Sequence, residues 1–363
     1  MSKPVITIIG LGMTGTSLGL GLKRAEGNFE VVGHDKDPGA AGDATKMGAV
    51  DRTAWNLFRA CDGAELVVLA TPLGETEELL KLIADDLREG CLVLVMAKVM
   101  QPALDIGAKY LRQDIHFVVG HPILSGVGGA LTARPDLFEE IPFCLATSTE
   151  TDASALQLAS DFVERMGAKP LYMDVHEHDG LIAAVEQLPQ FVGAVLLQSI
   201  SDSPAWVEGR RLAGRQFAQS TELGNSPERL FHDFLSNREN LISRIDQLQR
   251  TLADWRDKLA EDTLTVDEAA DNGSTAEVSQ TTTGADEVKT GEKTQEANHS
   301  LLTAIRSVWK TRESWEVQAI LKDWEMVPQI ETQSGGGFMQ QMFFGNLFRS
   351  KSSGREPSSQ QRE

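Results

Sequence analysis

The chain has 363 residues, 41% of them hydrophobic, and a formal net charge of −19 at pH 7. This length and composition predict two folded domains, each with an apolar core. The strong negative charge argues against nucleic acid as a partner, because the phosphates would be repelled.

The three cysteines, Cys61, Cys91 and Cys144, lie far apart and form no metal-ligand spacing. A sparse, odd set of this kind predicts reduced thiols and a cytoplasmic protein. An apolar strand pattern begins within a few residues of Met1, so we expect no signal peptide. We also find no run of about 18 apolar residues and expect no membrane span.

Short apolar runs alternate with helical patterns over residues 1–174. The first run is apolar throughout, as expected for a strand buried in a parallel sheet. Helical patterns include Ser17–Arg24 and Glu75–Leu87. The expected strands are Val5–Ile9, Phe29–Gly33, Leu66–Ala70, Leu92–Val95, Phe117–Val119, Phe143–Ala146 and Pro170–Met173. This alternation predicts an α/β domain with a Rossmann-type, doubly wound parallel sheet.

From residue 175 to 325 the apolar residues have the spacing of helices. One helical pattern covers Glu177–Ile200 and is interrupted only at Pro189. Two more cover Pro227–Asp262 and Leu301–Leu321. A helical layer this apolar needs a surface that covers it, which predicts an all-helical domain for dimerisation and substrate binding in a homodimer.

Two segments contain few large apolar residues. Residues 263–300 are rich in Thr, Glu, Gly, Ser and Asp, which predicts a disordered acidic insertion between two helices, with a docking role as the alternative. Residues 326–363 form a flexible tail around one apolar patch, Phe338–Phe348. We expect this patch to dock on the protein itself, and a partner or a membrane surface are the alternatives.

A glycine-rich motif of the form Gly-x-Gly-x-x-Gly follows the first strand and opens the first helix. Its residues are Gly10, Leu11, Gly12, Met13, Thr14 and Gly15. The first glycine suits a tight turn, the second lets a pyrophosphate approach the backbone, and the third lets the helix pack close to the strand. The N-terminus of the helix offers amides and the positive end of its dipole to phosphates.

Asp35 stands roughly 20 residues after this motif, at the end of the second expected strand. A carboxylate there accepts the hydroxyl groups of an adenosine ribose, which predicts NAD as the cofactor. NADP stays open because His34 and Lys36 flank the carboxylate. Thr71 and Pro72 follow the third strand at the carboxyl edge of the sheet, where ligands bind in such folds, so they are further candidate cofactor contacts. A simple turn at the end of a strand is the alternative for Pro72.

His121 ends the strand pattern Phe117–Gly120 and is followed by Pro122, which fixes the turn. A histidine at that position faces the same crevice as the glycine motif. A neutral imidazole can accept the proton of an alcohol while hydride leaves the adjoining carbon. His121 is therefore the candidate catalytic residue, and a purely structural role is the alternative.

Several motifs, in this order, resemble those of prephenate and arogenate dehydrogenases, a family of tyrosine biosynthesis. They are Ile8–Gly12 with Leu18–Leu20, Val32–Asp35, Ala70–Pro72, Gly120–Ile123 with Ser125 and Gly126, Ala133–Phe138, Glu177–Asp179 and Asn237–Leu241. The resemblance covers about residues 4–262 and 301–316. Many dehydrogenases share the glycine motif, whereas the His-Pro segment followed by an all-helical half is much more specific.

The resemblance implies an oxidative decarboxylation of prephenate or arogenate. In that reaction NAD or NADP takes hydride from the ring carbon that bears the hydroxyl, and loss of carbon dioxide makes the ring aromatic. His121 matches the family histidine that hydrogen-bonds this hydroxyl. Cationic or amide groups for the substrate carboxylates complete such a site, and Lys98 and Ser125 are the candidates here.

Three motifs of the family are altered in this chain. The serine of an Asp-x-Gly-Ser-x-Lys stretch is replaced by Lys98 or by Met96, depending on the alignment. Both histidines of a Ser-His-Leu-Pro-His motif are missing from Glu186–Gln190, and both arginines of a Phe-Arg-Asp-Thr-Thr-Arg motif are missing from Phe217–Glu222. An alanine and a glutamate cannot clamp a carboxylate as arginine does. The nearby cations are Lys98, Arg210, Arg211 and Arg215, which either supply the missing charge or are solvated surface groups.

Three hypotheses fit these patterns. The chain is an active prephenate or arogenate dehydrogenase with an altered pocket, a related dehydrogenase for another small acid, or a dinucleotide-binding dimer without catalytic activity. The intact glycine motif, Asp35 and His121 together favour retained chemistry, so the catalytic hypotheses rank first.

Overall fold

The computed structural model describes residues 3–25, 27–124, 132–147, 153–224, 226–262 and 300–321. The acidic insertion and the Phe-rich tail lie outside these residues, apart from Ser300. The described residues up to Leu241 form one compact unit, and those from Ile242 onward form a second. The domain boundary near residue 174 therefore stays a prediction.

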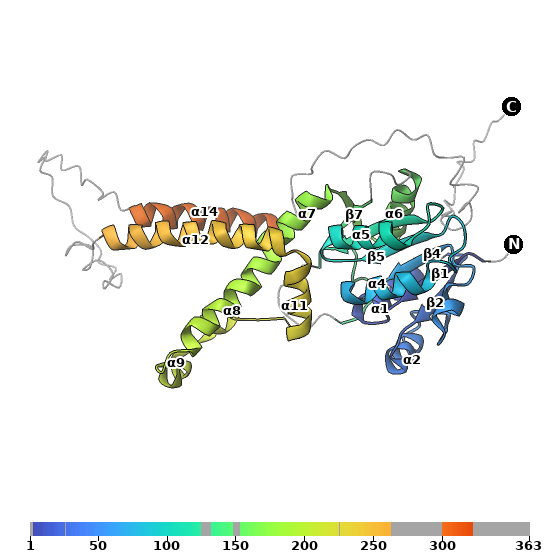
Figure 1. Cartoon of the computed structure of the whole chain (residues 1–363), viewed down its shortest axis with the longest axis horizontal. Coiled ribbons are helices and arrows are strands. Elements are labelled where there is room, and N and C mark those ends of the chain that lie inside the picture. Colours follow the sequence, from blue (N-terminus) through green and yellow to red (C-terminus); the bar gives the residue numbers. More distant parts are fainter. Residues whose placement is uncertain are drawn as a thin grey trace, which may run out of the picture. The chain divides into compact units, whose positions relative to one another are not determined.

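The first unit is built on one eight-stranded sheet, with the strand order β3-β2-β1-β4-β5-β6-β7-β8 (Figure 1). The strands are β1 (Val5–Ile9), β2 (Glu30–His34), β3 (Arg52–Thr53), β4 (Leu66–Leu69), β5 (Leu92–Met96), β6 (His116–Pro122), β7 (Pro142–Ala146) and β8 (Lys169–Tyr172). Except for β3, the ends of each strand lie within a few residues of the expected ends. The exposed two-residue strand β3 carries no apolar pattern that could have indicated it.

The sheet is not parallel throughout. Strand β7 runs antiparallel to β6, with His121 opposite Cys144, while β8 runs parallel to β7. The predicted parallel sheet therefore contains one antiparallel pairing. Strand β7 is almost completely buried, so it is apolar in either direction, and an apolar run alone does not reveal which way a strand points.

Helices cover both faces of the sheet, which confirms the doubly wound, Rossmann-type fold. One core contains side chains from α1 (Met13–Arg24), α2 (Pro38–Lys46) and α6 (Ala153–Arg165). The other core contains side chains from α3 (Leu57–Cys61), α4 (Leu73–Ile83) and α5 (Met100–Tyr110). The loops at the carboxyl ends of the parallel strands are thereby held between two packed layers.

The long helical pattern after residue 175 is continuous in space but changes its winding. It consists of α7 (Val175–Ile182), a π-helical turn η1 (Ala183–Gln187) and α8 (Leu188–Ser201). Pro189 lies in the first turn of α8. Proline has no N–H and crowds the carbonyl four residues earlier, so a wider turn just before it keeps the chain helical where the sequence pattern predicted an interruption.

The run Val175–Ser201 is, among the described residues, the one helical segment long and apolar enough to cross a membrane by those two criteria. The core helix of a protein without membrane spans meets the same criteria. Three polar side chains of this run, His178, Asp179 and Gln187, are buried inside the first unit. They make hydrogen bonds to neighbouring elements, as described below, and this is typical of a helix in a protein core.

The remaining described helices are α9 (Trp206–Leu212), α10 (Arg215–Ser220), α11 (Pro227–Ser236), α12 (Arg238–Glu261) and α14 (Ser300–Leu321). The single helix expected over Pro227–Asp262 is divided at Asn237, whose backbone leaves the helical region (φ −129°, ψ 29°). In the second unit, the Asp262 carboxylate accepts hydrogen bonds from the first backbone amides of α14, those of Ser300 (3.3 Å) and Leu301 (2.8 Å). Asp262 therefore caps α14.

Candidate active site

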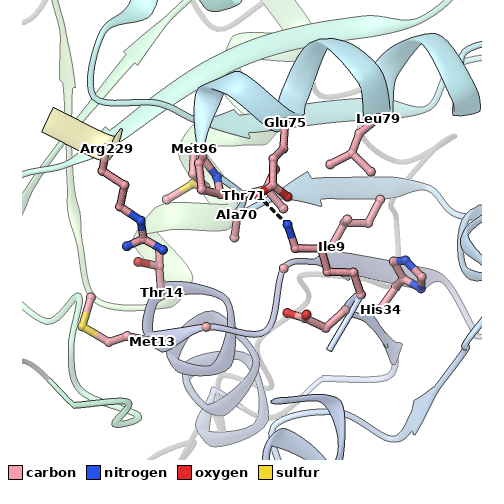
Figure 2. A pocket seen from close by; sticks show the side chains of 15 residues that line it. Ile9, Met13, Thr14, His34, Ala70, Thr71, Glu75, Leu79, Met96 and Arg229 are labelled. Atoms are coloured by element: carbon pink, nitrogen blue, oxygen red, sulfur yellow. Dashed lines mark hydrogen bonds and ion pairs between the residues drawn. The ribbon is translucent and has the colours of Figure 1, made fainter. Parts of the chain in front are cut away.

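A cavity of about 550 Å³ lies along the carboxyl ends of β1, β2, β4 and β5 (Figure 2). Seven of the predicted cofactor residues line it: Gly10, Gly12, Met13, Thr14, Asp35, Thr71 and Pro72. The other lining residues are Ile9, His34, Lys36, Ala70, Glu75, Leu79, Met96 and Arg229. The topology thus gathers three separate motifs of the sequence around one space.

The three glycines of the glycine-rich turn meet different surroundings. Gly10 has a positive φ of 91°, and a Cβ there would lie 2.7 Å from the carbonyl oxygen of Ala70. A Cβ on Gly15 would lie 1.8 Å from the carbonyl oxygen of Gly10. A Cβ on Gly12, which precedes α1, would meet nothing within 4 Å. Two glycines therefore allow close packing of the turn, while the third leaves open space in front of the helix N-terminus.

The predicted cofactor residues Leu11 and Gly15 do not line the cavity but support it. The backbone N–H of Leu11 donates to Oδ2 of Asp35 at 2.6 Å, and the N–H of Asp37 donates to Oδ1 at 2.8 Å. These bonds fix the carboxylate at the end of β2, beside the cavity. A carboxylate accepts about four hydrogen bonds, so Asp35 retains capacity for ribose hydroxyls.

Lys36 and Glu75 form an ion pair in the wall of the cavity, with Nζ 2.7 Å from Oε1 (Figure 2, dashed line). The hydrogen bond to Glu75 and its charge raise the pKa of Lys36 above its ordinary value. Asp35 adds to this effect. The cation beside Asp35 is thus already neutralised by a carboxylate from α4.

The residues around the cavity fit a dinucleotide. Gly12 leaves space at the N-terminus of α1, where amides and the helix dipole favour phosphate. Asp35 presents a carboxylate for a ribose. The hydroxyl oxygen of Thr71 is buried and has no hydrogen-bond partner among the described residues, so a polar group of a ligand can satisfy it.

His121 lies near the end of β6, close to this cavity, but it is not one of the residues that line it. The residue before it, Gly120, is the register partner of Met96 in the cavity wall. His121 is 8% exposed, and its Nδ1 lies 3.1 Å from Nε2 of His178. Nδ1 of His178 in turn lies 2.9 Å from Oδ1 of Asp179. The three buried side chains form one hydrogen-bonded chain.

The surroundings of Asp179 determine the direction of the hydrogen bonds in this chain. Its carboxylate accepts from the backbone N–H groups of Met100 (2.8 Å) and Gln101 (2.9 Å), at the N-terminus of α5. Such donors favour a carboxylate that accepts only, so His178 donates to it through Nδ1. Nε2 of His178 is then an acceptor for Nδ1–H of His121. This arrangement leaves Nε2 of His121 as an acceptor without a partner among the described residues.

Burial, the largest cause, acts together with the charges of His178 and Lys98 and lowers the pKa of His121 to about 3, while the charge of Asp179 opposes the change. The His121 imidazole is therefore neutral at neutral pH, as a proton acceptor must be before it acts.

Lys98, a predicted substrate contact, lies between two carboxylates. Its Nζ is 2.8 Å from Oε2 of Glu186 and 3.2 Å from Oδ2 of Asp233. Burial lowers the pKa of Lys98, but these two carboxylates more than offset the effect, so the pKa is raised overall. Lys98 is a partly buried, charged group whose ammonium already has partners.

Gln187, in the altered His-containing motif, is completely buried and connects three elements. Its amide nitrogen donates to the carbonyl oxygen of Asp233 at 2.7 Å. The amide of Asn237 donates to Oε1 of Gln187 at 2.9 Å and to the carbonyl oxygen of Asp179 at 2.8 Å. The widened turn η1 thus places Gln187 in a polar network that holds α7 and α11 around the histidine chain.

The remaining candidate cations lie on α9 and α10. Arg210 and Arg211 are exposed, and Arg211 pairs with Glu208 at 3.1 Å. Arg215 lines a second cavity of about 510 Å³, together with the aromatic rings of Trp206 and Phe217 among others. These three arginines do not line the cavity beside the glycine-rich turn. Ser125 lies outside the described residues.

Sequence reasoning missed several residues of the site. Glu75 and Leu79 lie four residues apart on α4 and both line the cavity, so their spacing after Pro72 could have indicated them. His178 and Asp179 were noted only as part of a motif, without a role. Arg229 carries no local signal, because it reaches the cavity from α11, far along the chain.

The sheet, the glycine-rich turn and the buried histidine chain beside them define a Rossmann-type dehydrogenase. Residues 18–172 match the family model of the prephenate dehydrogenase nucleotide-binding domain, and residues 174–266 match that of the prephenate dehydrogenase dimerization domain. Together the two models span well over half of the chain, and the chain belongs to the prephenate dehydrogenase family. This confirms the family resemblance inferred from the sequence.

Individual relatives agree with this assignment. The chain is 26% identical to the prephenate dehydrogenase of Bacillus subtilis over 69% of this chain and 68% of that protein. It is 28% identical to the prephenate dehydrogenase of Lactococcus lactis over 68% of this chain and 69% of that protein.

Among solved structures, the fold is similar to that of Aquifex aeolicus prephenate dehydrogenase in complex with hydroxyphenyl propionate and NAD+. The TM-score is 0.69 and the identity 22%, over 86% of this chain and 99% of that one. It is also similar to Synechocystis arogenate dehydrogenase, with a TM-score of 0.59 and 22% identity over 70% of this chain and 92% of that one. These similarities support the fold.

Proposed function

We propose that this chain is an NAD-dependent dehydrogenase that catalyses the oxidative decarboxylation of prephenate or arogenate. The observation that carries the proposal is the buried chain from His121 through His178 to Asp179, which leaves one neutral imidazole nitrogen as an acceptor beside the cavity. Family membership supports it, as does the fold similarity to a protein crystallised with an aromatic acid and NAD+.

The proposed cofactor contacts follow from the cavity. Gly12, Met13 and Thr14 offer the N-terminus of α1 to the pyrophosphate, Asp35 accepts from the adenosine ribose, and Thr71 offers its unpaired hydroxyl. When bound, the nicotinamide accepts a hydride from the substrate. Asp35 and the ion pair between Lys36 and Glu75 favour NAD over NADP, because neither provides a free cation for a 2′-phosphate.

The proposed role of His121 is that of the base. Its Nε2 accepts the proton of the ring hydroxyl while the hydrogen on the same carbon departs as hydride. The electron pair of the bond to the ring carboxylate then enters the ring, and carbon dioxide leaves. The imidazolium formed on His121 donates a hydrogen bond to His178. The Asp179 carboxylate accepts from His178 in turn and so stabilises the positive charge.

Lys98 and Ser125 stay the proposed substrate contacts. Lys98 is close enough to His121 for its charge to affect the pKa of that histidine, so it is well placed for an anionic substrate. To bind a carboxylate it would exchange Glu186 or Asp233 for the substrate. The usual arginine positions are occupied by Ala218 and Glu222, so recognition of the substrate would rest on other groups.

We further propose that the chain forms a homodimer in the cytoplasm. The matched C-terminal domain is a dimerization domain by its family description. Leu181, Val185 and Val195 on the long helical run are 42%, 65% and 48% exposed, respectively. Such apolar side chains favour coverage by a second copy. The three cysteines are free and buried, which supports a reducing compartment.

The test is NADH formation by the purified protein, offered prephenate and arogenate separately, each with NAD and with NADP. We expect turnover with NAD and one of the two acids, and a loss of roughly 100-fold or more in His121→Asn. No turnover by the wild-type protein, with NAD binding still measurable by calorimetry, would overturn the proposal. That outcome would favour another small acid or a non-catalytic dimer, the alternatives that the altered substrate motifs leave open.

A further inference from the structure

The cavity beside the glycine-rich turn contains one arginine that comes from a distant part of the sequence. Arg229 lies in the first turn of α11 and lines the cavity together with Gly12 and Thr14. Its guanidinium points toward Thr14, at the end of the cavity away from His34 (Figure 2). The inference below rests on the proposed function, because it concerns the same cofactor.

The other lysine or arginine in the cavity wall, Lys36, is already bound to Glu75. The guanidinium of Arg229 has no hydrogen bond or ion pair with any residue that the structure describes. Arg229 is therefore the cation of the cavity wall that lacks a carboxylate partner, and it lies at the end where the phosphates are expected.

The position of Arg229 in its own helix is electrostatically unfavourable. The N-terminal turn of a helix carries the positive end of the dipole, where an anion is stabilising and a cation is not. Ser226 caps this turn by accepting from the backbone N–H of Arg229, and Glu228 supplies the usual anion there. The helix therefore gains nothing from the charge of Arg229, which is directed toward the cavity instead.

We propose that Arg229 clamps the pyrophosphate of the dinucleotide against the N-terminus of α1. The amides that follow Gly12 contact the phosphates from one side, where no Cβ stands in the way. The planar guanidinium binds two phosphate oxygens from the other side. Residues of α11, in the half of the sequence matched by the dimerization domain, then contribute directly to cofactor affinity.

The experiment measures the affinity of the full-length protein for NAD, ADP-ribose, inorganic diphosphate and adenosine. The variants are Arg229→Gln, Arg229→Lys and the control Arg59→Gln, an exposed arginine outside the cavity wall. We expect Arg229→Gln to weaken NAD and ADP-ribose about tenfold, which corresponds to about 1.4 kcal/mol, and to leave adenosine unchanged. Arg229→Lys should lose less of the affinity for NAD than Arg229→Gln does, and Arg59→Gln should keep the wild-type affinity.

The outcomes separate this inference from the proposed function. If the wild-type protein binds NAD but forms no NADH with either acid, the proposed reaction fails and the affinities still test Arg229. Equal NAD affinities of wild type and Arg229→Gln would overturn the clamp, and so would an equal loss for adenosine. If Arg229→Gln weakens the binding of inorganic diphosphate but not that of NAD, the ligand of Arg229 is a free anion. This result also overturns the clamp. Thermal unfolding of each variant checks that the fold is retained.

Discussion

The two halves of the site are assembled in different ways. The cofactor cavity comes mainly from short motifs at the ends of neighbouring strands, with residues such as Gly12, Asp35 and Thr71. The histidine chain and the polar contacts near it join residues that are distant in sequence: His121 and His178 are 57 positions apart, and Lys98 and Asp233 are 135 positions apart. The first half depends on local backbone geometry, whereas the second depends on side chains that packing brings together.

The largest effect should come from the glycine-rich turn. Gly15→Ala places a Cβ 1.8 Å from the carbonyl oxygen of Gly10, so we expect a loss of roughly 3 kcal/mol in the free energy of unfolding. Gly12→Ala meets no neighbouring atom and should keep the stability within about 0.5 kcal/mol while weakening NAD binding. Urea unfolding and calorimetry on the pair measure both quantities. Equal stability loss in the two variants would contradict the idea that Gly15 is packed against Gly10 while Gly12 faces open space.

The histidine network should respond most strongly at Asp179. Asp179→Asn removes the charge that holds His178 in its tautomer and orients His121, so we expect kcat to fall roughly 100-fold while NAD affinity changes little. Steady-state kinetics and NAD calorimetry separate the two effects. Asp105→Asn, an exposed carboxylate on α5, is the control. Unchanged kcat in Asp179→Asn would show that the network is structural only.

The buried histidine also predicts a pH dependence of stability. In the unfolded chain His121 gains a proton below its ordinary pKa of 6.5, whereas in the folded chain it does so only near pH 3. Protons therefore favour unfolding between these values, and the free energy of unfolding should fall by on the order of 1 kcal/mol per pH unit below 6.5. Above pH 7 the group contributes nothing to this dependence.

Denaturant unfolding of wild type and His121→Gln between pH 7 and 4 measures this contribution as a difference in slope. Other titrating groups act on both proteins and cancel in the comparison. If the free energy of unfolding has the same pH dependence in both proteins, His121 is solvated in the folded protein. Burial would then not explain a neutral imidazole.

The smallest effect concerns the choice of cofactor. Glu75→Gln releases Lys36, which lies beside Asp35 at the ribose end of the cavity. Because an exposed ion pair contributes little in water, we expect the affinity for NADP relative to NAD to rise only about threefold. Glu77→Gln, on the same helix but paired with Lys109 outside the cavity wall, is the matched control. An equal change in both variants would rule out a specific role for Lys36.

The comparison of the two halves also explains what the sequence could predict. The bounds of β1 and the placement of Gly12 and Asp35 follow from apolar periodicity and glycine spacing, which are local properties. The direction of β7 could not be predicted, because a fully buried strand is apolar whichever way it runs. Asn237, where the expected helix is divided, donates hydrogen bonds to Asp179 and Gln187, and no local pattern specifies these contacts.

The same distinction applies to the candidate site, where local patterns indicated some residues and only tertiary packing brought the others together. His121 could be proposed as the base from its place at a strand end, but its partner His178 comes from a helix that the sequence does not orient. Lys98 was predicted as a cation for the substrate carboxylates, and the structure gives it two carboxylate partners from η1 and α11. Arg229 also reaches the cavity from α11. Such encounters between distant segments require the tertiary structure.

The π-helical turn at Ala183–Gln187 sets the rotation of α8 about the helix axis relative to α7. It lies between α7, which carries His178 and Asp179, and α8, which carries the apolar Val195. Each residue added to or removed from an α-helix rotates everything beyond it by about 100°. A single deletion that restored regular winding here would turn the apolar surface of α8 in a new direction relative to α7, and it would also move Gln187 within its polar network. In the proposed homodimer, this one extra residue would therefore set the direction in which the apolar side chains of α8 face a second copy.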